Sequence, residues 1–78
     1  ANTLKVACVP SGWDGGWHST PVLQWVVTLS GAAEMQVSSG SVIRLARGIP
    51  VLLTDTSGKG HHTSVVGDDD WCSMLISI

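Results

Sequence analysis

Short apolar runs separated by turn residues recur along the whole of this 78-residue chain. Turn clusters interrupt these runs about every eight to twelve residues, a spacing that is typical of all-β sandwiches and barrels. The i, i+3, i+4 apolar spacing of an amphipathic helix is not sustained in any segment. The runs that we interpret as strands cover residues 3–9, 21–30, 34–38, 41–46, 50–55, 62–66 and 71–78. The pattern therefore predicts an all-β fold, a small antiparallel β-barrel or jelly roll of about seven or eight strands without significant helix.

The longest predicted strand carries polar residues among apolar ones on one of its faces. Side chains alternate across a strand, so Gln24, Val26 and Thr28 share a face, and His18 and Thr20 have the same parity. We expect these five side chains to point into the barrel. The run from Glu34 to Ser38 is expected to pair back on this strand as a hairpin.

The opposite face of the same strand is continuously apolar, with Leu23, Trp25, Val27 and Leu29. Such a strip has to meet another layer, either a second subunit or residues 3–9 folded over it. Only 13% of the residues are charged, against about 25% in typical proteins. We therefore expect a homodimer.

Charge and hydropathy exclude several classes of function. The net charge is −2 and the four basic residues are scattered, so nucleic-acid binding is not expected. No segment approaches the ~18 apolar residues of a membrane span. Residues 1–12 lack the basic start and unbroken apolar core of a secretory signal. We expect a single cytoplasmic domain over residues 1–78 that neither binds nucleic acid nor enters a membrane.

The chain has two cysteines, Cys8 and Cys72, and both lie in apolar strand-like runs. Two cysteines do not make a disulfide framework, and unpaired cysteines behave as small buried hydrophobic side chains. We expect both to be buried in this way, with a disulfide or a reactive thiol as the alternative.

Gly12, His18, Thr20, Gln24 and Gly31 form one spaced motif, and Gly58 and His61 belong to a second. The two motifs resemble those of the cupin superfamily. The first cupin motif is Gly, five residues, His, one residue, His, three or four residues, Glu, six residues, Gly. Here Gly12, His18, Thr20, Gln24 and Gly31 fall at those spacings, with Thr20 in place of the second His and Gln24 in place of the Glu.

The second cupin motif ends Pro-x-Gly-x-x-His-x-x-x-Asn. Gly58 and His61 match it, while Thr56 stands for the Pro and Val65 for the Asn. The resemblance spans residues 12–78 and implies a small single-domain cupin whose metal-binding motifs are degenerate.

The resemblance implies one interior site that holds both histidines. An imidazole can give or take a proton near neutral pH, so we interpret His18, His61 and Gln24 as catalytic residues, with His18 as base and His61 as acid. In a regular strand His61 points inward and His62 outward, whereas a bulge would reverse the pair, so the sequence leaves open which of the two faces the interior. Asp55 either orients His61 or caps the loop that follows it, and we favour the cap.

A largely apolar cavity would surround these groups. Thr20, Val26 and Thr28 would contact the ligand, and Trp13 and Trp17, in or beside a glycine-rich loop, would cover it. The predicted function is an enzyme of the isomerase, cyclase or lyase type. Its substrate would be a small apolar or aromatic molecule with a carbonyl or hydroxyl group.

Two alternatives stay open. A metal-dependent cupin, either a dioxygenase or a metal-assisted isomerase, would hold Fe, Mn, Ni or Zn on His18, His61 and Gln24. This set lacks an anionic ligand, so tight metal binding is not expected. The other alternative is a binding or sensing module that does no chemistry.

Overall fold

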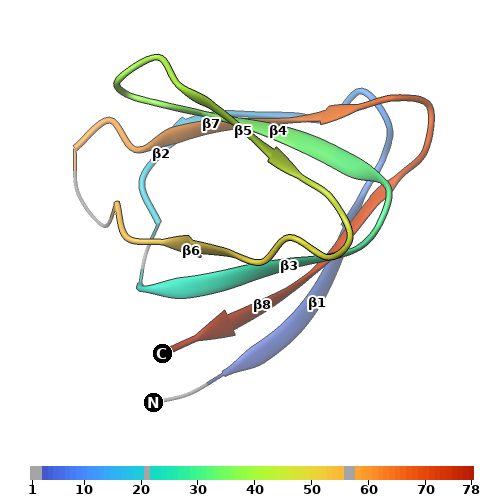
Figure 1. Cartoon of the computed structure of the whole chain (residues 1–78), viewed down its shortest axis with the longest axis horizontal. Coiled ribbons are helices and arrows are strands. Elements are labelled where there is room, and N and C mark those ends of the chain that lie inside the picture. Colours follow the sequence, from blue (N-terminus) through green and yellow to red (C-terminus); the bar gives the residue numbers. More distant parts are fainter. Residues whose placement is uncertain (1–2, 21, 56–57) are drawn as a thin grey trace.

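The computed structural model describes residues 3–20, 22–55 and 58–78, which form eight strands in two facing sheets (Figure 1). The predicted strand start at residue 21 and the predicted loop residues 56–57 lie outside the described residues. In chain order the strands are β1 (Leu4–Val9), β2 (Asp14–His18), β3 (Gln24–Ser30), β4 (Ala32–Val37), β5 (Val42–Leu45), β6 (Val51–Leu53), β7 (His61–Val66) and β8 (Trp71–Ser77). The described part of the chain contains no helix, and so none that could cross a membrane.

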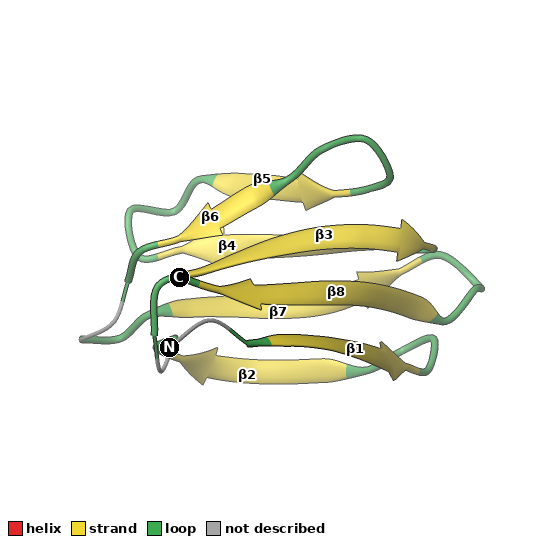
Figure 2. Ribbon diagram, turned by 90° about the horizontal axis from the view of Figure 1, so that it is seen from below, coloured by secondary structure: helices red, strands yellow, loops and turns green. Residues whose placement is uncertain are grey.

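The two sheets are antiparallel and contain four strands each. One sheet, called here the β3 sheet, has the order β1-β8-β3-β6, and the other, the β7 sheet, has the order β2-β7-β4-β5. Figure 1 shows the two layers edge-on, and Figure 2 looks onto the outer side of the β3 sheet. This arrangement confirms the predicted all-β jelly-roll class.

The expected hairpin between β3 and β4 is wrong. The β4 strand pairs with β5 and β7, so the chain crosses from one sheet to the other between Ser30 and Ala32. Gly31 makes this crossing with a φ of 73°, and a Cβ there would collide with the backbone carbonyl of Asp70. Glycine fits this position because it alone adopts positive φ without a side-chain penalty.

The strand β2 was not predicted, because its two glycines resemble a turn. Gly15 lies under the ring of Trp13, which occupies the space a Cβ would need. The strand pairs with β7 through an irregular register, with a shift between Asp14 and Trp17. The glycines therefore serve close packing and a local irregularity inside a strand, as they often do.

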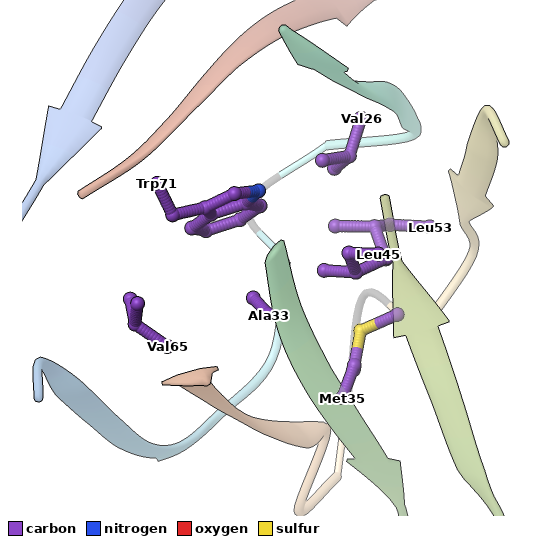
Figure 3. Packing of buried hydrophobic residues seen from close by; sticks show 7 residues of the cluster. All are labelled: Val26, Ala33, Met35, Leu45, Leu53, Val65 and Trp71. Carbon is purple, nitrogen blue, oxygen red and sulfur yellow. The ribbon is translucent and has the colours of Figure 1, made fainter. Parts of the chain in front are cut away.

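The space between the sheets is filled by alternate residues of the facing strands. The buried pattern in β7, where every second residue is buried, is the period-two signature of a strand with one interior face. Figure 3 shows the resulting cluster, which consists of Val26, Ala33, Met35, Leu45, Leu53, Val65 and Trp71. Trp71 fills the core, whereas Trp25 is 37% exposed on the outer side of the β3 sheet.

The expectation that Cys8 and Cys72 are unpaired and buried is wrong. The two residues lie directly opposite each other in the β1–β8 ladder and form a disulfide. Both point to the outer side of the sheet, and Cys8 is exposed because β1 is an edge strand. In the chain-entropy model a bridge across 64 residues stabilises a fold by about 4 kcal/mol, much of what so small a domain needs. Disulfides are typical of oxidising compartments and do not favour the predicted cytoplasmic location. That location stays a prediction.

Candidate functional site

Two histidines meet at one end of the β7 sheet. His18 is the last residue of β2 and His61 the first of β7, and the two are paired across the ladder. Their ring centroids are 4.8 Å apart at an interplanar angle of 63°. His61 is 3% exposed, whereas His18 is exposed to solvent. One ring is thus held inside the barrel and the other stands at its mouth.

Gln24 reaches the same place from the other sheet. The sequence parity placed His18 and Gln24 on one strand, but His18 ends β2 and Gln24 begins β3. Both residues line a cavity of about 130 Å³, together with His61 and the buried Thr63. The rest of the wall is mainly apolar and includes Val26 and the half-buried Trp13. The volume is well below the roughly 300–1,000 Å³ of pockets for drug-sized molecules, so a ligand of few atoms fits best.

Asp55 fixes the orientation of the inner imidazole. Nδ1–H of His61 donates a hydrogen bond to Oδ2 of Asp55 over 2.7 Å, and the backbone carbonyl of Asp55 accepts one from the Thr20 amide over 3.1 Å. The sequence favoured a loop cap for Asp55, but its carboxylate orients His61. With Nδ1 protonated, the neutral ring keeps the lone pair of Nε2 available as a proton acceptor.

The second ring is held more loosely. Nδ1–H of His18 donates to the carbonyl oxygen of Gly16 over a long 3.4 Å. The sequence assigned His18 the role of base because burial would disfavour its cation. That reason does not hold, since His18 is exposed. Of the two rings that meet at this end of the β7 sheet, His61 is the one with a carboxylate partner.

Two threonines that were expected to contact a ligand have hydroxyl groups that form hydrogen bonds within the protein instead. Thr20 is buried, and its hydroxyl donates to the carbonyl of Val22 over 2.9 Å. The hydroxyl of Thr28, also buried, accepts a hydrogen bond from the indole nitrogen of Trp71 over 3.1 Å. The threonine that lines the cavity is Thr63. Its position two residues after His61 on one strand could have revealed it, because such residues share a face.

Trp17 does not cover the cavity. Its ring lies 5.7 Å from that of His62 on the outer side of the β7 sheet, and Nζ of Lys59 lies 4.1 Å from its centroid. His62 points outward, as expected for a regular strand, and its Nε2–H donates to Oδ1 of Asp14 over 2.6 Å. The outer face of the sheet therefore carries a second histidine–carboxylate pair that is separate from the cavity.

Asp14 receives more than one hydrogen bond. The backbone N–H of Gly16 first, and the His62 side chain second, hold the pKa of the Asp14 carboxyl below its usual value of 3.8. Because the folded-state pKa is lowered, this contribution to stability is present above that usual value and is lost as the pH falls through the folded-state pKa. Asp14 is fully exposed, so the contribution is small.

A larger and more open hollow of about 530 Å³ lies at the opposite end of β7. Arg44, Arg47, Asp68 and Asp69 are among its lining residues. No ion pair joins these charges to one another among the described residues, and none of the three histidines lines the hollow. We place the candidate site at the smaller cavity, because the titratable imidazoles and the polar groups converge there.

The chemistry of the donors does not suit a tightly held divalent metal. The cavity offers two imidazoles and the neutral amide of Gln24, and Nδ1 of His61 is already bonded to Asp55. Within the described residues, no group of three or more His, Cys, Asp or Glu side chains is placed to hold an ion. Divalent sites in proteins usually have at least three protein ligands, often with a carboxylate, so no step below passes through a metal.

Changing Gln24 to Glu should create the anionic ligand that the cavity lacks. We expect the unchanged chain to bind Ni²⁺, Mn²⁺, Fe²⁺ or Zn²⁺ weakly, and Gln24→Glu to bind them at least about tenfold more tightly, because a carboxylate oxygen joins the two imidazoles. Isothermal titration of the purified proteins measures the difference. Gln24→Asn, which keeps a neutral amide at this position, is the control and should bind these ions no more tightly than the unchanged chain. Stoichiometric metal that survives extensive dialysis of the unchanged chain would contradict this expectation.

Comparisons with known proteins agree with this geometry at the level of the fold. No protein-family model matches the sequence, and no curated protein matches it. Solved structures do match. A conserved protein of unknown function from Streptococcus pyogenes has a TM-score of 0.77 and 25% identity over 99% of this chain. A cupin-2 domain protein from Shewanella frigidimarina has a TM-score of 0.76 and 16% identity over 97% of it. The DMSP lyase DddQ from Ruegeria pomeroyi has a TM-score of 0.74 and 22% identity over 97%.

These matches cover different shares of the other proteins. The chain spans 63% of the streptococcal protein, 69% of the Shewanella protein and 37% of the lyase. At this level of identity the likeness concerns the fold. The two facing antiparallel sheets, with the matched structures, define a jelly roll of the cupin type. The chain is a small domain with the cupin fold, as its two motifs predicted.

Proposed function

We propose that this domain is an enzyme that moves a proton on a small carbonyl- or hydroxyl-bearing molecule held in the cavity between the two sheets. One observation carries the proposal: the buried His61 is oriented by Asp55 and faces a second imidazole in a largely apolar cavity. A carboxylate that holds an imidazole in one tautomer, and stabilises the imidazolium that forms, is a recurrent device of general-base catalysis.

In the proposed reaction His61 is the base. Its Nε2 takes a proton from the carbon next to a carbonyl group, and Asp55 stabilises the resulting imidazolium. The electron pair of the broken C–H bond moves toward the carbonyl oxygen. Gln24 and Thr63 line the cavity, and in this proposal their amide and hydroxyl groups donate hydrogen bonds to that oxygen.

The second half of the reaction uses the exposed ring. His18 at the mouth of the cavity protonates the intermediate at a new position, which gives an isomer, or protonates a leaving group, which gives an alkene. This assignment reverses the roles expected from the sequence, because the carboxylate partner belongs to His61 and solvent reaches His18. Between turnovers the proton on His61 returns to the neighbouring His18 ring, directly or through solvent at the mouth of the cavity, which restores the neutral base and the protonated acid.

Elimination is the first form of this chemistry to test. Two of the similar solved structures are described as DMSP lyases, and they match this chain with TM-scores of 0.74 and 0.77. A lyase that starts by removing a proton beside a carbonyl group needs one base and one polar group for the oxygen, and the cavity offers both. Within the part of the chain that the structure describes, no group of three His, Cys, Asp or Glu side chains supports the metal-dependent alternative. The experiment below distinguishes an enzyme from a binding module.

Solvent deuterium exchange tests the proposal with a panel of candidate compounds, so the natural substrate need not be identified first. The chain is incubated in D₂O with small ketones, keto acids and carboxylates that carry a leaving group at the β carbon. Proton NMR then follows the loss of C–H signals next to the carbonyl and the appearance of alkene signals. We expect exchange or elimination with at least one compound. A compound that shifts the His61 resonances but neither exchanges nor reacts would instead make the domain a binding module.

A further inference from the structure

The hollow of about 530 Å³ at the far end of β7 from the histidine cavity, called here the charged hollow, has two walls of opposite charge. One wall carries Arg44, in β5, and Arg47, in the loop that follows β5. The other wall carries Asp68 and Asp69, in the turn between β7 and β8. Figure 2 shows this loop and this turn at the same end of the molecule. The positive and negative charges of the hollow balance, but they are separated across its width.

The two walls lie apart because a whole strand separates them. In the β7 sheet β4 lies between β5 and β7, and neighbouring strands are about 4.8 Å apart, so β5 and β7 are separated by roughly 10 Å. Between the walls the hollow is lined by the small side chains of Ala32 and Val66, which are paired across the β4–β7 ladder. Within the described part of the chain, none of the four wall charges forms an ion pair, either with one another or with Glu34, which is opposite Arg44 in the β4–β5 ladder.

Backbone contacts hold both walls in place. The backbone of Arg47 forms an isolated β-bridge with that of Thr28 in β3. On the acidic side, the carbonyl oxygen of Asp70 lies so close to Gly31 that a Cβ on this glycine would collide with it. The Asp70 carboxylate also accepts a hydrogen bond from the backbone N–H of Ser11 over 3.2 Å. Anchored segments therefore present the charges, which reduces the conformational entropy lost when a ligand binds.

We propose that the charged hollow binds a small zwitterion of about the length of a dipeptide, with its carboxylate on the two arginines and its ammonium group on the two aspartates. Guanidinium groups donate paired hydrogen bonds to a carboxylate, and carboxylates accept hydrogen bonds from an ammonium group. An extended dipeptide is about 7 Å long and can reach both walls, whereas a single amino acid, about half as long, reaches only one.

A ligand with both charges matches the hollow better than an ion of either sign. A simple anion would bind the arginines but also face the aspartates, and a simple cation would face the arginines. The volume is also within the roughly 300–1,000 Å³ of pockets that hold small molecules. The proposal does not depend on the proposed function, because none of the three histidines lines the charged hollow.

Alanylalanine and its blocked forms test the ligand. Acetylation removes the positive charge of the dipeptide, and amidation removes the negative one. The ¹⁵N-labelled full chain is titrated with each compound, and NMR follows the amide shifts of Gly31 and Gly67, which line the hollow. We expect a dissociation constant on the order of 1 mM for alanylalanine, and at least about tenfold weaker binding for alanine and for each blocked form.

Two outcomes of this titration overturn the proposal. Equal binding of alanine or of either blocked form would mean that one wall alone is sufficient. The absence of shifts at the two glycines up to about 50 mM alanylalanine would mean that the hollow does not take a zwitterion of this length.

The acidic turn provides a matched control for the residues. The double variants Arg44→Gln/Arg47→Gln and Asp68→Asn/Asp69→Asn should each weaken the binding of alanylalanine at least about tenfold. Asp70→Asn also removes a charge from the turn, but Asp70 does not line the hollow, so binding should stay within about twofold. All five side chains are exposed, and the amide spectrum confirms that each variant is folded. Unchanged binding in either double variant overturns the proposal, and so does an equal loss in Asp70→Asn, because the net charge of the turn would then be sufficient.

Discussion

Gly60→Ala is expected to lower the free energy of unfolding by about 4 kcal/mol, whereas Gly58→Ala should lower it by only about 1 kcal/mol. Both glycines have positive φ, 78° at Gly60 and 77° at Gly58, so the backbone penalty for a side chain is the same. They differ in their surroundings. A Cβ at Gly60 would collide with the carbonyl group of His18 and the amide nitrogen of Ser19, while nothing lies within 4 Å of a Cβ at Gly58.

The collision at Gly60 involves backbone atoms, which a rotamer change cannot move aside. To accept the methyl group, the end of β2 has to separate from the start of β7, where His18 and His61 are paired. Urea unfolding monitored by tryptophan fluorescence compares the two variants directly. Equal losses of stability would mean that positive φ alone matters and that the close approach of the two chain segments is not required.

The same variant links the fold to the site. If Gly60→Ala folds at low temperature, the contact between the rings of His18 and His61 should be lost, while the hydrogen bond between His61 and Asp55 remains. Nuclear Overhauser effects between the two imidazoles report the first change. The outer pair of His62 and Asp14 should be unaffected, because it lies on the other side of the sheet.

Local patterns predicted much of this fold, and non-local pairings account for the errors. Alternation along β3 correctly placed Val26 and Thr28 inside and Trp25 outside, because the direction of a strand side chain depends only on parity. The crossing at Gly31 could not be predicted in this way. Whether a strand pairs with its neighbour in sequence or moves to the facing sheet depends on contacts with distant residues, here Asp70.

In the candidate site, too, local patterns predicted some features and non-local pairings determined the others. The motif resemblance predicted that His18 and His61 lie together, and the two residues meet across the β2–β7 ladder. The parity argument that put His18 and Gln24 on one strand was wrong, because His18 ends β2 and Gln24 begins β3. The parity of β7 could have identified Thr63 beside His61. No sequence pattern distinguishes a hydroxyl that lines a cavity from one that is satisfied by the backbone, as Thr20 is by the carbonyl of Val22. The pairing of Cys8 with Cys72 likewise depends on an edge strand whose position is set by the rest of the fold.

Replacing His61 by Ala should reduce turnover of the substrate found by deuterium exchange by about 10²–10⁴-fold, because the base that takes the proton is removed. His18→Ala should cause a loss in the same range if the second proton transfer limits the rate. The fold should persist in both variants, since neither ring belongs to the hydrophobic cluster. The ratio of kcat to KM for each purified variant, with circular dichroism to confirm folding, gives the result.

The chain provides its own control for this experiment. His62 is the next residue, and it has a carboxylate partner at 2.6 Å, nearly the same distance as the 2.7 Å between His61 and Asp55, yet it lies on the outer face. His62→Ala and Asp14→Asn should therefore leave turnover within about twofold, whereas Asp55→Asn should lower it by about 10²-fold.

The effect of Asp55→Asn can be measured by the tautomer of the His61 imidazole, which would not change if Asp55 had a purely structural role. Nitrogen-15 chemical shifts distinguish the imidazole tautomers, and the neutral His61 ring should carry its proton on Nδ1 in the unchanged chain. In Asp55→Asn the amide can either donate to Nδ1 or accept from it, so we expect the Nδ1–H tautomer to lose its dominance and turnover to fall with it. Full activity in both His61→Ala and His18→Ala would show that the cavity works by shape alone. Loss of activity in His62→Ala alone would move the reaction to the outer face of the β7 sheet.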